Sequence, residues 1–530
     1  MRLHAVATLA APPATGPVTD QPTPGVCALA HRPLPDGTFT SLHRNSQEEE
    51  ARALRVPHAP TPGPLQTLYQ RLAQPEPSPA ARAEAAAWVR GALACTAQDE
   101  CDLPASPDDL YAWMRGQAAR TAQAYADYLQ QRRAGAPRRY FSNRAHALYF
   151  LRSVAPTKLV DGAWLYGLMA HGGNPRLAPL VRTYLEELGD GQADKNHVTL
   201  YRKLLARHGM ADDLPTDDAL YEQGLMQLAL AWTAEEFLPE IIGFNLGYEQ
   251  LPLHLLITAY ELNELGIDPY YFTLHVTVDN SDSGHARQAC DAVLHMLPPA
   301  GARGDGDADA RQAFWQRVRA GSQLGSVGRG TVSVIESFDA AAEATRIFQA
   351  KAAAGAGLHS DYARIGGRTV NQWLAEPERM GEFLLALADG GWIQHGKPAQ
   401  DSRLWNLLQG ERAEMFGVFS PYELQVIHDW IRGADSADGQ AYFEPAAANQ
   451  SGRRPSFRAL QRMHGSAGRS TGGLPADDAS DPDRVALDER LAQLTGDARR
   501  AALVAAMGPA LHWTPAGLHA TRLWAAGGLA

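Results

Sequence analysis

The sequence predicts an all-α protein built around one bundle of helices. Between residues 143 and 297, apolar residues recur at steps of three and four positions, which is the pattern of amphipathic helices. Few runs rich in β-branched residues interrupt this block, and glycines or prolines separate its segments. Helices that each carry one apolar face bury it against one another, so we expect a packed bundle of several helices.

Each expected helix of this block ends at a recognisable break. The first ends at Pro156, which lacks the amide hydrogen that a helix interior needs. Another stops at the glycine-rich turn 189–191, and the next helix starts soon after it. A long helical pattern at 236–267 contains Pro239 and Pro252, which we expect to kink it. The expected helical segments are 143–156, 157–172, 175–191, 194–210, 217–232, 236–267 and 286–297.

The rest of the chain divides into segments of different composition. The N-terminal sequence is rich in proline, threonine and glycine, and much of the sequence after 444 is poor in large apolar residues, which favours irregular structure. The predicted organisation is an irregular segment (1–65), a helical extension (66–142), the core bundle (143–297), a linker (298–310), a mainly helical C-terminal domain (311–444), a disordered segment (445–485) and a helical tail (486–530).

Composition argues against several classes of function. The formal net charge of -11 leaves no excess of basic side chains for phosphates, so nucleic acid is not an expected partner. No apolar run approaches the ~20 residues that a membrane helix needs, and the short apolar N-terminus is broken by Pro12 and Pro13. The four cysteines lack a usual zinc spacing and indicate free thiols in a reducing compartment. We therefore expect a cytoplasmic protein with no membrane partner.

The stretch HVTVDNSDSGH, residues 275–285, concentrates possible metal ligands. Local propensity alone predicts a strand that runs into a turn, yet the stretch lies between two helical segments. On a helix, His275 and Asp279 share one face, Asp282 falls in the same sector and His285 lies at its edge. Two imidazoles and a carboxylate suit iron, manganese or zinc. We expect a distorted helix, widened near its last serine and glycine so that His285 turns toward the others.

Other acids and a histidine of the core block could complete such a site. Glu249 lies in an apolar helical run, where an unpaired carboxylate is costly to bury. Glu187 ends one helix and His197 opens the next, so the turn between them allows both to aim at one point. Two glutamates, an aspartate and three histidines from several helices are what a carboxylate-bridged diiron site needs. Each residue alone is also explained as a solvated or hydrogen-bonded side chain. The same explanation applies to His254, Glu261 and Glu264.

Three motifs in residues 145–295 carry a resemblance to a known family. They are LVDGAWLYG, YLEELGDGQADKNHVTLYRKLL and GFNLGYEQLPLHLLITAYELNELGIDPYYFTLHVTVDNSDSGHA. Together they resemble the iron-containing redox enzyme family of the heme-oxygenase-like diiron oxidases and oxygenases. The resemblance implies a heme-oxygenase-like helical bundle without heme, here with an additional mainly helical C-terminal region. The ligands it implies are Glu187, His197, Glu249 as a bridge, His275, Asp279 and His285, with Asp282 as the alternative to His285 and Asp161 as an extra acidic ligand.

The resemblance also implies an O2-dependent nonheme iron oxidoreductase. Two nonheme ferrous ions, as cofactors, would activate dioxygen to oxidise a small organic substrate by N-oxygenation, desaturation or C–C cleavage. An external electron donor is a further expected partner, because no flavin or nicotinamide motif is visible in the sequence.

Two other functions fit the same sequence. A metal-free bundle of this fold could be a cofactorless oxidase or a thiaminase-like hydrolase, and the hydrolase would need a nucleophile such as Cys290, the one cysteine of the core block. A non-enzymatic protein would instead bind a partner through its C-terminal half. Bound metal separates the leading hypothesis from both alternatives.

Overall fold

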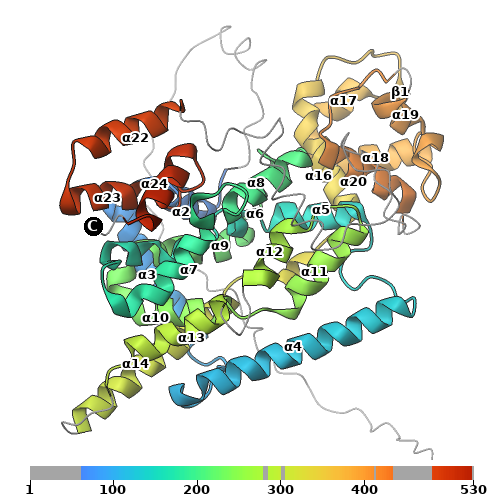
Figure 1. Cartoon of the computed structure of the whole chain (residues 1–530). Coiled ribbons are helices and arrows are strands. Elements are labelled where there is room, and N and C mark those ends of the chain that lie inside the picture. Colours follow the sequence, from blue (N-terminus) through green and yellow to red (C-terminus); the bar gives the residue numbers. More distant parts are fainter. Residues whose placement is uncertain (1–60, 279–283, 300–304, 411–412, 434–479, 528–530) are drawn as a thin grey trace, which may run out of the picture. The chain divides into compact units, whose positions relative to one another are not determined.

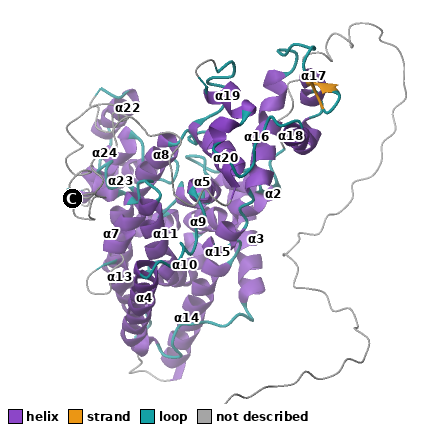
Figure 2. Ribbon diagram, turned by 90° about the vertical axis from the view of Figure 1, so that its right-hand side faces the viewer, coloured by secondary structure: helices purple, strands orange, loops and turns teal. Residues whose placement is uncertain are grey.

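The computed structural model describes residues 61–278, 284–299, 305–410, 413–433 and 480–527. Helices make up nearly all of the regular structure in these ranges, which confirms the predicted all-α class (Figure 2). Strands β1 (Arg364–Ile365) and β2 (Arg368–Thr369) form a short antiparallel hairpin. Within the described ranges, no helix combines the length and the apolar character that crossing a membrane requires.

The helices of the predicted core block follow one another with short connections (Figure 1). Asn143 and Asn196 cap α5 and α8, since each side chain accepts a hydrogen bond from a backbone amide in the first turn. The α-helices are α5 (Arg144–Ser153), α6 (Ala155–Lys158), α7 (Ala178–Glu187), α8 (His197–Arg207), α9 (Glu222–Trp232), α10 (Ala234–Tyr248), α11 (Leu253–Glu264), α12 (Tyr270–Val278) and α13 (His285–Met296). The 3-10 helices between them are η2 (Ala163–His171), η3 (Pro175–Leu177), η4 (Gly189–Gly191) and η5 (Asp218–Tyr221).

The long helical pattern predicted at 236–267 is two helices, not one kinked helix. Pro239 lies inside α10 next to a local distortion at Phe237, as a proline within a helix is expected to produce. Pro252 has extended backbone and is the N-cap of α11, so it separates the two helices. Glu249 therefore lies at the C-terminal end of α10 and not in the middle of a helix.

The expectation of one distorted helix across residues 275–285 is wrong. Helix α12 ends at Val278, and α13 begins at His285. Gly284 has extended backbone with φ -84° and ψ -168° and forms the N-cap of α13, so no widened helical turn occurs there. Residues 279–283, between the two helices, lie outside the described residues.

The described core consists of two clusters of buried apolar side chains. The first includes side chains of α7, α10 and α13, such as Tyr184, Phe244 and Cys290. The second includes side chains of α8 and α12, such as Tyr201 and Tyr271. Elements from both clusters supply the acids and histidines described below, so the candidate site lies where the two clusters adjoin.

Helix α14 (Asp305–Gln323) packs directly on α10, although we predicted a linker at 298–310 and a domain start at 311. The contact depends on glycine on both sides. A β-carbon at Gly243 would overlap the carbonyl oxygen of Val318, and one at Gly321 would overlap that of Glu240. Arg317 adds an ion pair with Glu240, whose oxygen lies 2.6 Å from the guanidinium. This helix is therefore part of the bundle.

The remaining helices flank the bundle. On the N-terminal side, Tyr128 of the long helix α4 donates a hydrogen bond of 2.8 Å to Glu261 of α11. The same carboxylate accepts backbone hydrogen bonds from Tyr140 and Phe141, so Glu261 has a structural role. The N-terminal elements are α2 (Pro64–Leu72), α3 (Pro79–Thr96), η1 (Pro107–Asp109) and α4 (Leu110–Arg133).

The C-terminal half is also helical where the structure describes it. Of the segment predicted to be disordered, 445–485, only residues from 480 on are described, and α22 begins there at Pro482. The elements before it are η6 (Leu324–Ser326), α15 (Thr331–Glu336), α16 (Ala340–Gly355), α17 (Val370–Leu374), η7 (Pro377–Arg379), α18 (Met380–Asp389), η8 (Ala399–Asp401), α19 (Arg403–Gln409) and α20 (Pro421–Arg432). The last three are α22 (Pro482–Ala492), α23 (Gly496–Ala506) and α24 (Pro515–Ala525).

Candidate metal centre

A tight turn brings Glu187 and His197 together. Glu187 is the last residue of α7 and His197 the first of α8, and His197 Nδ1 lies 2.5 Å from Glu187 Oε2. Between them, Gly189, Asp190 and Gly191 all have positive φ, of 63°, 50° and 76°. Residues other than glycine rarely adopt this conformation, so the Gly-Asp-Gly sequence explains the reversal of the chain.

Asn196 fixes the geometry of this turn from within. Its Oδ1 accepts a hydrogen bond of 2.9 Å from the amide of Thr199, and its Nδ2 donates one of 3.2 Å to the carbonyl of Leu188. One buried side chain thus ties the end of α7 to the start of α8. A β-carbon at Gly189 would overlap the amide nitrogen of Asn196, so the close approach also requires glycine.

Asp161 and His275 complete one group of possible ligands around this pair. Asp161 Oδ2 lies 3.3 Å from His275 Nε2 and 3.9 Å from His197 Nδ1. Gly162 allows this approach, because a β-carbon there would lie 2.8 Å from Cβ of Glu187. His275 Nδ1 lies 2.8 Å from the carbonyl oxygen of Tyr271 and donates to it, which leaves Nε2 facing Asp161.

Glu249 and His285 form a second group with Glu187. His285 Nδ1 lies 3.1 Å from Glu249 Oε2 and 3.4 Å from Glu187 Oε1. Its other nitrogen, Nε2, lies 3.0 Å from Glu186 Oε2 and donates a hydrogen bond to it. Metal-binding histidines commonly carry such a carboxylate on the nitrogen that faces away from the metal.

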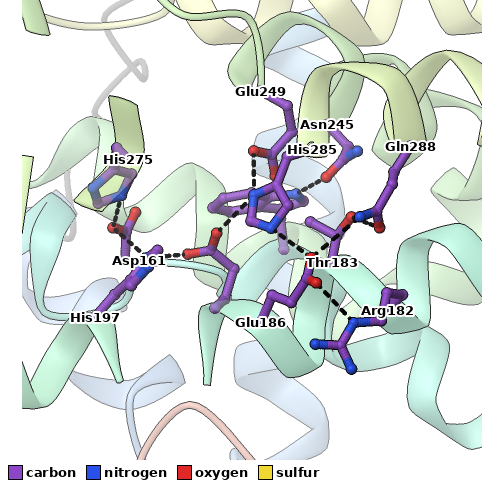
Figure 3. Close-up of polar contacts among 12 residues, drawn as sticks. Asp161, Arg182, Thr183, Glu186, His197, Asn245, Glu249, His275, His285 and Gln288 are labelled. Atoms are coloured by element: carbon purple, nitrogen blue, oxygen red, sulfur yellow. Dashed lines mark hydrogen bonds and ion pairs between the residues drawn. The ribbon is translucent and has the colours of Figure 1, made fainter. Parts of the chain in front are cut away.

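The two groups share Glu187 and together have the composition of a dinuclear metal site. In each group, one ligand atom per residue lies within 4.8 Å of the others. Figure 3 shows Asp161, His197 and His275 on one side, with Glu249 and His285 on the other. Apart from His275, which is partly buried, these residues and Glu187 are almost completely buried. Three buried carboxylates this close together repel one another unless a cation lies between them, so the donor set fits bound metal ions.

Charged neighbours stabilise the ionised carboxylates. Burial opposes ionisation of Asp161, but the Lys158 ammonium, 3.9 Å away, and the hydrogen bond from His275 hold the pKa of Asp161 well below its usual range. Tyr271 also donates a hydrogen bond to this carboxylate. Burial likewise opposes ionisation of Glu186, and the hydrogen bonds from His285 and Arg182 lower its pKa to about 2.

The structure brings most of the predicted ligands into one place. Glu187, His197, Glu249, His275 and His285 converge, and Asp161, the extra acid implied by the resemblance, lies among them. Asp279 and Asp282 lie outside the described residues. Glu264 pairs with Arg132 at 2.6 Å and, like Glu261, is absent from both groups.

Two polar neighbours of the site, Glu186 and Lys158, were not predicted from the sequence. Glu186 looks like one more acid at a solvated helix end, and only its spacing from Arg182, four residues earlier, hints at a fixed position. Lys158 stands three residues before Asp161, a spacing that places both on one face of a helical turn. Neither signal is specific without the fold.

A cavity of about 450 Å³ reaches the candidate metal centre. Asp161, Glu187, Glu249 and His275 line one part of it. His254, also in the wall, has its pKa lowered to about 4 by burial and by the charge of Lys158, so its imidazole is neutral at neutral pH. Further wall residues include the apolar Phe150, Val154, Leu220, Leu255 and Phe272 and the polar Ser326, Arg329 and Thr331. A cavity with apolar walls and a few polar groups suits a small organic molecule.

The nucleophilic role considered for Cys290 does not fit its surroundings. The thiol is buried next to Met114, with 3.8 Å between the sulfur atoms, and it is not in the wall of the cavity. Burial, with a further contribution from Asp291, raises the pKa of Cys290 to about 12. A thiol that stays protonated at neutral pH is a poor nucleophile.

Fold and site together define a class of protein, an all-α bundle with carboxylates and imidazoles gathered at its centre. Residues 148–322 match the model of the family described as iron-containing redox enzyme. This segment contains all of the converging residues in both groups. The match supports oxidoreductase function and iron as the metal. A search of curated proteins found no match, and a search of solved structures found none either.

Proposed function

We propose that this chain is a nonheme diiron oxidase or oxygenase that uses dioxygen to oxidise a small organic substrate. The observation that supports this best is the sharing of Glu187 between two buried groups of carboxylates and imidazoles. A carboxylate can bridge two metal ions through its two oxygens, and histidines serve as terminal ligands. Because Glu249 belongs to only one of the groups, the proposed bridge is Glu187 and not Glu249, which the resemblance implied. The family of segment 148–322 supports iron over other metals.

Two ferrous ions held by these residues would supply a dioxygen-binding site and electrons for its reduction. The chain prepares the site through its hydrogen bonds. The Tyr271 carbonyl orients His275, and the Glu186 carboxylate orients His285, so that one nitrogen of each ring faces the carboxylates. Lys158 presents a charged ammonium at the cavity wall beside Asp161, where it can donate a hydrogen bond or a proton to a bound molecule.

The cavity gives the substrate a place beside the ligands. Phe150, Leu255 and Phe272 provide apolar contacts and exclude water from the reacting groups. We propose a small organic substrate that lies against these walls and meets the oxidant next to Glu249 and His275. The proposed reaction is N-oxygenation, desaturation or C–C cleavage. Where the substrate supplies fewer electrons than the reduction of dioxygen requires, an external electron donor supplies the rest.

Anaerobic titration with Fe(II), followed by metal analysis, tests the proposal. We expect about two irons per chain, because two ligand groups are present. A Glu249→Ala, His275→Ala double variant removes one ligand from each group and is expected to lose most of the iron. The matched control is Glu235→Ala with His295→Ala, which makes the same two changes at an exposed glutamate of α10 and an exposed histidine of α13. Unchanged iron content in the first variant would refute the proposal.

A further inference from the structure

Helix α24 packs on the turn that joins Glu187 to His197, and α22 and α23 pack on α24. We call α22, α23 and α24, with their connections, the C-terminal helical module (480–527). The module lies outside the segment that matches the iron-containing redox enzyme family, 148–322. Met507, Leu518 and Trp524 are among its buried side chains, with at most 3% exposure, and Met507 and Trp524 belong to the same apolar cluster as α7.

Helix α24 contacts the glycine turn through its backbone and through one arginine. Arg522 Nη1 donates a hydrogen bond of 2.7 Å to the carbonyl oxygen of Gly191. A β-carbon at Gly191 would overlap the carbonyl oxygen of Leu518, so the turn and α24 touch backbone to backbone. The positive φ of Gly191 and this close contact favour glycine for separate reasons.

A buried histidine of the module contacts the residue next to His197. His512 is 1% exposed, and its Nδ1 lies 3.1 Å from Nδ2 of Asn196. The Asn196 amide is oriented by Thr199, whose backbone N–H donates to Oδ1, so Nδ2 must be the donor to His512. His512 therefore accepts through Nδ1 and helps hold the side chain that ties α7 to α8.

The module also holds α7 itself. Tyr184, three residues before Glu187, donates a hydrogen bond of 2.6 Å from its hydroxyl to the carbonyl oxygen of Met507. Arg202 of α8 lies 3.7 Å from the ring centre of Trp513, a cation–π contact. The two helices that carry Glu187 and His197 therefore both contact the same C-terminal segment.

We propose that the C-terminal helical module is a positioning element of the metal centre, in which His512 and Arg522 hold the Gly-Asp-Gly turn so that Glu187 and His197 converge. The inference rests on the proposed function, since it treats Glu187 and His197 as metal ligands. The functional unit then extends beyond the family segment to the C-terminal helices. His512 and Arg522 act on the site through the turn and do not touch a metal or the substrate.

Metal titration of the full chain tests this proposal. We expect His512→Ala and Arg522→Met to weaken binding of Co(II) or Fe(II) by about 10-fold or more, the range seen when the partner that orients a metal ligand is removed. His512→Gln, which keeps a hydrogen-bond acceptor, should recover part of the loss. The control is His519→Ala, because His519 lies on α24 and pairs with Asp488 of α22 at 2.8 Å without contacting the turn. That variant should lower thermal stability and leave metal affinity unchanged.

The outcomes separate this inference from the proposed function. Wild-type metal affinity in both His512→Ala and Arg522→Met would overturn the positioning role while leaving the metal centre intact. Equal losses of affinity in His519→Ala would also overturn it, because they would show general destabilisation. A wild-type chain that binds no metal would refute the proposed function itself. Should His512→Ala fail to fold, the test uses Arg522→Met and Tyr184→Phe. Each removes one hydrogen-bond donor and should weaken metal binding, and wild-type affinity in both would overturn the positioning role.

Discussion

Replacing Glu186 by glutamine should weaken metal binding although this side chain is not a proposed ligand. The carboxylate accepts a hydrogen bond from His285 Nε2 at 3.0 Å and one from Arg182 at 2.8 Å. Glu186→Gln keeps the size of the side chain and removes its charge, so the His285 ring loses the charged acceptor of its Nε2 hydrogen. Because His285 belongs to the group with Glu187 and Glu249, its misorientation should lower the affinity for metal.

The size of the effect follows from the carboxylate's surroundings. Burial opposes ionisation, yet the hydrogen bonds from His285 and Arg182 lower the pKa of Glu186 from 4.5 to about 2. A pKa change of this size corresponds to a free energy of about 3 kcal/mol. The two partners, His285 and Arg182, share this energy, and solvent screens it because the carboxylate is 28% exposed. About 1–2 kcal/mol is left for the interaction with His285. Metal affinity should therefore fall by about 10-fold.

Co(II) titration followed by visible absorption is a suitable assay, with thermal unfolding of the metal-free protein measured alongside. Glu186→Gln should shift the titration and change the unfolding temperature little. Glu235→Gln makes the same chemical change at an exposed position of α10 and should bind Co(II) like the wild type. If Glu186→Gln also bound Co(II) with wild-type affinity, the assignment of His285 as an oriented ligand would be refuted.

Three further predictions concern the turn, acid stability and the buried thiol. Gly189→Ala should destabilise the fold by about 1–3 kcal/mol and reduce iron content, because the position has φ 63° and no room for a β-carbon. A variant with the unfolding temperature and iron content of the wild type would contradict this prediction. Burial, with the charges of Arg144 and Arg207, lowers the pKa of His208 to about 3 in the folded protein. As the pH drops, this histidine is protonated in the unfolded chain first, so stability falls between about pH 6.5 and pH 3. Denaturant unfolding measures how much the free energy of unfolding of the metal-free protein falls between pH 7.5 and pH 5. This fall should be about 2 kcal/mol smaller in His208→Gln than in the wild type, and an equal fall in both would exclude this role of His208. Cys290→Ala should retain iron binding and oxidase activity. A variant that keeps its iron but loses a catalysed reaction would instead support the hydrolase hypothesis.

The sequence predicted the helices better than their ends. Apolar periodicity locates the helices of the core block, because each must bury one face. The start of α13 at His285, after an extended Gly284, differs from the single ligand-bearing helix that we predicted, although glycine favours a turn at this position. The helix α14 was split by a predicted linker, because its packing through Gly243 and Gly321 is visible only in three dimensions.

The candidate site was predictable to the extent that its chemistry is local. The glycine turn between Glu187 and His197 can be recognised from the sequence, since positive φ at successive residues calls for glycine. Asp161 came only from the family resemblance, as a lone acid before a glycine has no distinctive spacing. The contact of His512 with Asn196 joins residues more than 300 positions apart, and no periodicity or motif reports a contact of that kind.

The central claim is that two irons lie next to each other, joined by Glu187. X-ray absorption at the iron edge, on the full chain loaded anaerobically with Fe(II), tests it most directly. The account predicts an iron–iron scattering path at about 3.5–4 Å, with nitrogen and oxygen as the nearest neighbours, and the loss of that path in Glu187→Ala. Iron that shows only nitrogen and oxygen neighbours in the wild type, at full loading, would contradict it.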